Sequence, residues 1–248
     1  MSLTDEFCKS PDLRKEEQKL CYEFASCFQD MIADLETKGH LRSELKVEGT
    51  DKERMKFMNV LWNTRKVTNA FNMFFDMYVD KIKPDSRQRL RRFLELNKPY
   101  GLTEEDLRYL LYSEMIFVFL QNVEEFRFAL LFILKLPIRI HSSIDKKGKE
   151  VNNKTTLGTL LKSLRELGIE KADKLEVIDY KLRNGLSHGL FWFDEKADEH
   201  DSKTHLHYSE DISFKRIGCI DLADLYLKMR NQSIYTNCLL NVIGDWFE

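Results

Sequence analysis

The stretch from Leu107 to Leu136 constrains the fold of this chain most strongly. It is apolar on most faces of an α-helix, so a helix formed here should lie at the centre of a bundle. Thr103 and Asp106 supply a capping pair at its start, and the helix should stop before Pro137. A membrane-spanning helix would rarely tolerate the charges in this stretch. We therefore expect a buried core helix that carries Glu114, Glu124, Glu125 and Arg127.

The remaining sequence also favours helices, because long periodic runs are separated by few breaks, with only 10 Gly and 4 Pro in the chain. An alternating pattern appears only after Gly189 and predicts two short strands joined by a charged turn. The predicted fold class is all-α, a helical bundle with a short β-hairpin. The expected helices are 10–38, 51–83, 86–97, 103–136, 156–167, 172–187 and 221–245, and the expected strands are 190–194 and 204–208.

The chain of 248 residues is long enough for one large domain or two small ones. Pro99-Tyr100-Gly101 breaks the helical pattern and predicts a boundary between an N-terminal helical region, 1–100, and a second helical domain, 101–248. A single continuous bundle is the alternative. Residues 1–100 carry no motif that suggests a role.

Charge and cysteine content narrow the class of protein. The net charge of −2 argues against a protein held on nucleic acid by overall positive charge, although a local basic patch is compatible with it. Five cysteines without metal-ligand spacing indicate reduced thiols in the cytoplasm. The polar start of the chain does not resemble a signal peptide. We expect a cytoplasmic protein that does not associate with membranes and that uses neither metal nor cofactor.

The segment Lys181–Gly189 gathers a fixed cation, an amide and an imidazole. On a helix over 172–187 the apolar stripe consists of Leu175, Ile178, Leu182 and Leu186. Asn184 and His188 are four residues apart and then lie on the opposite side, with Arg183 on the flank. The simpler interpretation is an ordinary helix end, with Gly189 as a stop signal and His188 favoured by the helix dipole.

Arg183-Asn184 followed by His188 resembles the Arg-polar-x3-His signature of the HEPN superfamily, named for higher eukaryotes and prokaryotes nucleotide-binding. Thr156-Leu157-Gly158-Thr159-Leu160 resembles the Leu-Gly-x-Leu helix start that often precedes this signature. Phe191-Trp192-Phe193-Asp194 resembles the short aromatic strand that often follows it. The resemblance covers about residues 103–247 and does not extend to the first 100 residues.

The resemblance implies a metal-independent endoribonuclease of the toxin or defence type that cleaves RNA as a homodimer. Arg183, Asn184 and His188 would be the catalytic residues, and a nucleotidyltransferase antitoxin would be a possible partner. DNA should be inert, because it lacks the 2′-hydroxyl. The alternatives are a non-catalytic module that binds nucleotides or RNA, and a helical adaptor. We expect substrate contacts from Lys181, Ser187, Lys146 and Lys147.

Several further groups of residues are candidate sites. Glu124 or Glu125 could orient Arg183, and the sequence does not choose between them. Four arginines within 87–92 and four lysines within 146–154 could contact phosphates, or could simply be solvated. His205 and His207 would face one side of a strand with Asp201 near, but no third ligand stands at a familiar metal spacing.

Overall fold

The structure is a computed structural model that describes residues 2–11, 13–79, 101, 103–135, 139–140, 149–150, 152, 154–169, 179–193 and 205–248. These residues are mostly helical, as predicted. The helices are α1 (Leu3–Cys8), α2 (Lys15–Thr37), α3 (Asp51–Val79), α5 (Glu104–Ile133), α6 (Leu157–Glu166), α7 (Tyr180–Ser187) and α8 (Leu222–Phe247), with a 3-10 turn at Ser43–Lys46. The strands are β1 (Arg139–Ile140), β2 (Lys149–Glu150), β3 (Phe191–Phe193), β4 (His205–Ser209) and β5 (Ile217–Asp221).

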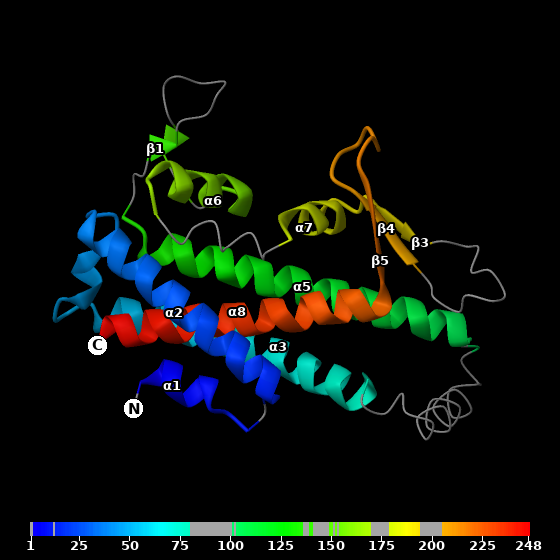
Figure 1. The fold of residues 1–248 in the computed structure, drawn as a ribbon, viewed down its shortest axis with the longest axis horizontal. Helices are drawn as coiled ribbons and strands as arrows, with labels where there is room; N and C mark the ends of the chain where they lie inside the picture. Colours follow the sequence, from blue (N-terminus) through cyan, green and yellow to red (C-terminus); the bar gives the residue numbers. More distant parts are fainter. Residues whose placement is uncertain are drawn as a thin grey trace.

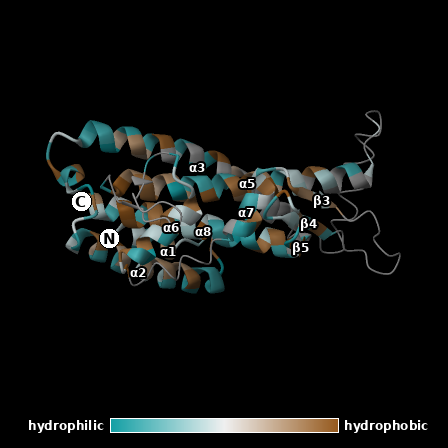
Figure 2. Ribbon diagram, turned by 90° about the horizontal axis from the view of Figure 1, so that it is seen from above, coloured by the Kyte–Doolittle hydropathy of each residue, from teal (hydrophilic) through white to brown (hydrophobic). Residues whose placement is uncertain are grey.

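The long helices α5 and α8 lie side by side at the centre of the molecule (Figure 1). α5 is buried on most sides, as its sequence predicted, although Leu110, Phe117 and Phe128 are exposed. The helices α1 and α2 pack on α8 on one side of this pair, α3 packs on α5 on the opposite side (Figure 2), and α6 and α7 lie above α5 in Figure 1. Hydrophilic and hydrophobic residues alternate around α2, which matches a helix with one face on the core (Figure 2).

The helices α5, α8 and α6 each begin directly after a residue whose side chain caps the helix start. The Thr103 hydroxyl accepts the Asp106 N–H at 3.1 Å, and the Asp106 carboxylate accepts the Thr103 N–H at 2.7 Å, so the expected capping box is present. Asp221 caps α8 in the same way, since its carboxylate accepts the Asp224 N–H at 2.7 Å. Thr156 caps α6, and Gly168 follows that helix with a φ of 68°.

The N-terminal prediction was wrong in one respect. The first helix does not begin at Ser10-Pro11; instead a separate helix, α1, precedes this turn, and α2 starts at Lys15. The reason for α1 is tertiary, because the carboxylate of Asp245 in α8 accepts the N–H groups of Leu3 and Thr4 at 2.7 and 3.1 Å. These groups would otherwise be unsatisfied at a helix start.

The predicted hairpin is part of a three-stranded antiparallel sheet in the order β3-β4-β5. Its third strand was missed, because Ile217–Asp221 runs straight into α8 and contains Gly218. Gly218 lies against the Tyr208 ring: a Cβ at position 218 would come within 2.3 Å of that ring, which would then have to move. Trp192, His207 and Cys219 are directly opposite one another across the three strands.

Residues 80–100 lie outside the described part of the chain. They include the predicted helix 86–97 and most of the predicted boundary at Pro99–Gly101. The described helices on both sides of it share one hydrophobic core. Phe57 of α3 stacks on Phe132 of α5 with ring centroids 3.6 Å apart, and α1 and α2 pack on α8. None of the described helices combines the length and apolar character needed to cross a lipid bilayer.

A buried ion pair joins α3 to this core. The Arg65 guanidinium, 3% exposed, donates to the Glu125 carboxylate at 3.1 Å, and Glu125 is 4% exposed. Arg65 also donates to Asn122, and to Asn237 and Ser233 of α8 at 3.0 and 2.9 Å. Several hydrogen bonds therefore compensate the guanidinium for the loss of water.

We expect Arg65→Met to lower the free energy of unfolding by about 3–5 kcal/mol, because it leaves the Glu125 carboxylate buried without its cation. Urea unfolding followed by circular dichroism measures this loss. Lys66→Met is the matched control, since Lys66 is exposed and should change stability by less than about 0.5 kcal/mol. Equal effects of the two substitutions would show that the buried pair does not anchor α3.

Candidate functional site

The helix α7 carries the Arg-polar-x3-His motif, and it is shorter than predicted. It begins at Tyr180, because Asp179 leaves the helical conformation and accepts the Leu182 N–H on its carboxylate at 2.9 Å. The expected helix from 172 to 187 is therefore not continuous. Of its predicted stripe, Leu175 and Ile178 lie outside the described residues, whereas Leu182 and Leu186 are buried.

One side of α7 is fixed against the sheet and the core. A Cβ at Gly185 would come within 2.9 Å of the Ser209 carbonyl oxygen and 3.1 Å of Tyr208, so the helix and β4 approach closely only because position 185 is glycine. The opposite side carries the motif: His188 is exposed, and Asn184 and Arg183 are half-buried. This is the outward orientation that the spacing of Leu182 and Leu186 predicted.

Arg183 is held by Glu124, which decides between the two acids left open by the sequence. Its guanidinium Nη2 donates to Glu124 Oε1, and Nη1 donates to Asn184 Oδ1 at 3.2 Å. Arg127, one turn further along α5, donates to Glu124 Oε2 at 2.8 Å and to the Thr155 carbonyl at 3.1 Å. We call Arg127, Glu124 and Arg183 the arginine clamp. The clamp joins α5 to α7, and through Arg127 it also contacts Thr155, the residue before the α6 cap.

The arginine clamp carries net positive charge, since one carboxylate stands between two guanidinium groups. Partial burial alone would raise the pKa of Glu124, but the hydrogen bonds and charges of Arg127 and Arg183 outweigh it and hold that pKa below the ordinary glutamate value. Glu124 therefore remains ionised near neutral pH. The Arg183 side chain is 18% exposed, so an anion at the surface of α7 can reach the edge of its fork.

The other predicted substrate-binding residues are less closely grouped. Lys181 is exposed and lies 3.6 Å from the Glu210 carboxylate. Ser187 is exposed, and its hydroxyl donates to the Asn184 carbonyl at 3.2 Å rather than to the His188 imidazole, as a nucleophile paired with its base would do. Lys146, Lys147 and the arginines of 87–92 lie outside the described residues, so their contribution stays a prediction.

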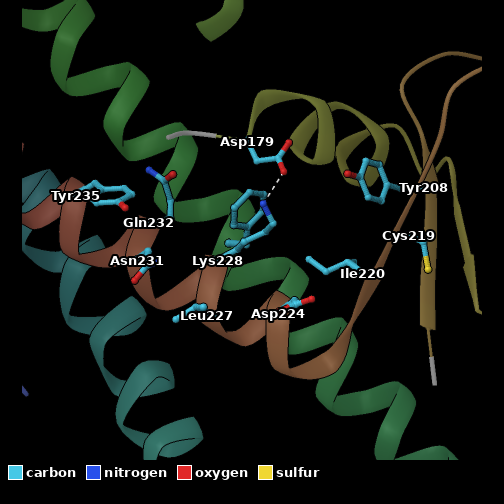
Figure 3. Close-up of a pocket in the computed structure, with 11 residues that line it drawn as sticks. Asp179, Tyr208, Cys219, Ile220, Asp224, Leu227, Lys228, Asn231, Gln232 and Tyr235 are labelled. Atoms are coloured by element: carbon cyan, nitrogen blue, oxygen red, sulfur yellow. Dashed lines mark hydrogen bonds and ion pairs between the residues drawn. The ribbon is translucent and has the colours of Figure 1, made fainter. Parts of the chain in front are cut away.

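A pocket of about 560 Å³ lies beside the start of α7 and was not predicted. Figure 3 shows Asp179 directed toward Lys228 of α8, while Tyr208 and Cys219 approach from the sheet. The Lys228 ammonium donates to Asp179 Oδ2 at 2.7 Å, so the residue that caps α7 also pairs across the pocket. Burial, together with the carboxylates of Asp179 and Glu210, raises the pKa of Tyr208 to about 12, which keeps its phenol neutral.

The paired histidines do not form a metal site within the described chain. His207 stacks on Trp192 with ring centroids 5.5 Å apart, and His205 is opposite Asp221 in the sheet. Asp201 lies outside the described residues. Across the ranges that the structure describes, no group of three or more His, Cys, Asp or Glu side chains is placed to hold a metal ion.

Sequence reasoning missed Arg127, Asp179 and Lys228 as parts of this region. The role of Arg127 could have been predicted locally, because it stands three residues after Glu124 on one helix, where the two side chains are neighbours and can form an ion pair. Asp179 had a weaker local signal, since aspartate is a preferred helix cap. Lys228 had none, because only the packing of α8 against α7 brings it to Asp179.

Comparisons of the chain with models of protein families, with curated proteins and with solved structures found no match.

We expect Glu124→Gln to lower stability at pH 7 by no more than about 1 kcal/mol, because the clamp is partly exposed and solvent screens it. The folded-state pKa of Glu124 lies below the unfolded value, so the unfolded chain binds the extra proton. The stabilisation is therefore complete above the ordinary glutamate pKa of about 4.3 and is lost as the pH falls through the folded value.

Urea unfolding at pH 7 and at pH 3 measures this dependence. The difference between the wild type and Glu124→Gln should shrink at the lower pH. Glu114→Gln, on the same helix, is the matched control. A difference for Glu124→Gln that stays the same at both pH values would contradict the role of the ionised carboxylate.

Proposed function

We propose that this chain is a metal-independent endoribonuclease that acts as a homodimer on single-stranded RNA. One observation carries the proposal: Glu124 holds Arg183 on the flank of α7, next to the outward side on which His188 is exposed. A cation and an imidazole held on one short helix are the two groups that transfer of a phosphate ester needs. The sequence resemblance to HEPN ribonucleases supports the same assignment.

The reaction proposed is attack of a ribose 2′-oxygen on the adjacent phosphorus. The new P–O2′ bond forms as the P–O5′ bond breaks, which leaves a 2′,3′-cyclic phosphate and a free 5′-hydroxyl. An imidazole has an ordinary pKa near 6.5 and therefore exchanges protons readily at neutral pH. His188, in protonated form at the end of α7, would give a proton to the leaving 5′-oxygen.

The other motif residues would stabilise the transition state. Arg183 would donate to the non-bridging phosphate oxygens, where negative charge increases as the phosphorane forms. Asn184 would hold either the imidazole or the phosphate by hydrogen bonds. In a dimer the motif faces would meet, and the neutral imidazole of the second copy would take the proton from the 2′-hydroxyl. A nucleotidyltransferase that covers this face would act as an antitoxin.

A second function, binding of RNA or nucleotides without cleavage, is favoured by one specific observation. The Arg183 fork already donates to Glu124 and to Asn184, and its Nε is buried without a hydrogen-bond partner among the described residues. Fewer of its donors are then available to a transition state. A fluorescence titration with RNA and with nucleotides, run beside a nuclease assay, separates binding from cleavage.

We expect His188→Ala to reduce cleavage of a labelled single-stranded RNA in excess EDTA by about 10²–10⁴-fold, the usual contribution of a general acid. Arg183→Ala should reduce it by about 10²–10³-fold, the loss typical of one electrostatic donor. The product should carry a 2′,3′-cyclic phosphate, which mass spectrometry identifies, and RNA methylated at the 2′-oxygen should resist cleavage.

Lys162→Ala is the matched control, because Lys162 is an exposed cation on α6 that pairs only loosely with Glu166 at 3.8 Å. Melting temperatures should show that all three variants are folded. Cleavage that is unchanged in both motif variants would end the nuclease proposal. Binding without any cleavage would favour the binding module, and a dimer in sedimentation that binds neither RNA nor nucleotide would favour an adaptor.

A further inference from the structure

Three of the five cysteines meet in the core, although they stand far apart in the sequence. Cys8 ends α1, Cys21 lies in the first half of α2, and Cys238 lies in α8. The sulfur of Cys21 is 3.1 Å from that of Cys8 and 3.2 Å from that of Cys238. All three residues are 0% exposed. We call these residues the thiol cluster.

A buried cysteine usually serves as a small apolar side chain, and apolar packing alone does not require sulfur to touch sulfur. In the thiol cluster each contact joins different helices, so the packing of α1 and α2 on α8 brings the sulfurs together. The remaining two cysteines lie elsewhere: Cys219 is exposed on β5. Cys27 is six residues beyond Cys21 on α2 and points about 240° away around that helix.

The surroundings distinguish the three sulfurs chemically. The hydrogen bond with Cys238, together with that from Cys21, outweighs burial and lowers the pKa of Cys8 to about 7. Hydrogen bonds with Cys21 and Cys8, together with burial, raise the pKa of Cys238. Cys8 is therefore the member that holds a thiolate near neutral pH. The thiolate is the form that reacts with peroxides.

We propose that the thiol cluster is an oxidation site, at which a peroxide forms one disulfide between two of the three helices α1, α2 and α8. The Cys8 thiolate attacks one peroxide oxygen and breaks the O–O bond, which gives a sulfenic acid and releases the other oxygen as hydroxide. The hydroxide takes up the proton that Cys8 had lost to solvent and becomes water. A neighbouring thiol then attacks the Cys8 sulfur and displaces the sulfenic oxygen as a second water. Two thiols lose two electrons and two protons in total, and the peroxide is reduced.

Access to the thiol cluster comes through α1. This helix has only six residues, and the Asp245 carboxylate holds its first N–H groups. A helix of fewer than two turns opens locally more readily than the core does. Opening of α1 would expose Cys8 and uncover Cys21 and Cys238. The third thiol can afterwards exchange with the disulfide, so the final pair is set by equilibrium within the cluster.

The test counts thiols in the full chain before and after hydrogen peroxide. The protein is reduced, desalted and oxidised while folded, and thiols are then titrated in denaturant. The count should fall from five to three and return to five with dithiothreitol. The oxidised protein should also melt several degrees higher, because a disulfide restricts the unfolded chain. No loss of thiols at peroxide concentrations that oxidise free cysteine would overturn the proposal.

Two variants locate the disulfide. Cys27→Ser/Cys219→Ser keeps the thiol cluster and should fall from three thiols to one. Cys8→Ala/Cys238→Ala/Cys219→Ser leaves only Cys21 and Cys27, which point apart on one helix and cannot reach each other, so its two thiols should persist. A loss of thiols in the second variant that matches the first would place the oxidation outside the cluster and overturn the proposal.

Peptide mapping of the oxidised wild type keeps the test independent of how well the variants fold. Trypsin should release Cys8 in residues 1–9, Cys21 in 20–38 and Cys238 in 231–248. A cross-link between two of these peptides is the expected result, and fragmentation assigns the link in 20–38 to Cys21 rather than Cys27. Cross-links through Cys27 or Cys219 alone would contradict the proposed site.

Discussion

The fold depends on the burial of α5. A helix that is apolar on most sides cannot lie at the surface, so other elements must cover it, and α8 does so along much of its length. The position of α5 then fixes everything that packs on it, including α3 through Phe57 and α7 through Leu182. A charged residue of α5 that faces the core, such as Glu125, needs a partner on a neighbouring helix.

Glu124 and Glu125 show how one helix serves both the core and the candidate site. Adjacent residues on a helix point about 100° apart, so the two carboxylates face different neighbours. Glu125 is turned inward, where it accepts hydrogen bonds from Arg65 at 3.1 Å and from Gln121 at 3.4 Å. Glu124 is turned toward α7, where it fixes Arg183 while solvent still reaches the pair. The arginine clamp is thus built on the buried central helix α5, and a side chain on such a packed element is held in a defined position.

The sheet and α8 hold the buried side and the start of α7. Gly185 lets the helix approach β4, and Asp179 both caps the helix and pairs with Lys228 of α8. The motif helix is therefore held at its start, along its buried side and at its flank. The side that remains exposed is the one that carries His188 and Asn184. Sequence periodicity predicted this exposed side, because two buried leucines four residues apart already define the opposite face.

The sequence by itself determined those features whose formation depends on residues close together in the chain. The capping pair Thr103–Asp106, the cap at Asp221 and the apolar period of α5 each involve residues within one or two helical turns, so they can be read without knowledge of the fold. The early helix α1 and the third strand depend on partners from other elements, since Asp245 of α8 accepts the first N–H groups of α1 and β5 forms by pairing with β4. The choice of Glu124 for Arg183 and the meeting of Cys8, Cys21 and Cys238 were decided by tertiary structure alone. The physical reason is that periodicity tells which way a side chain points around its own helix, whereas only the packing of helices against one another determines what it meets there.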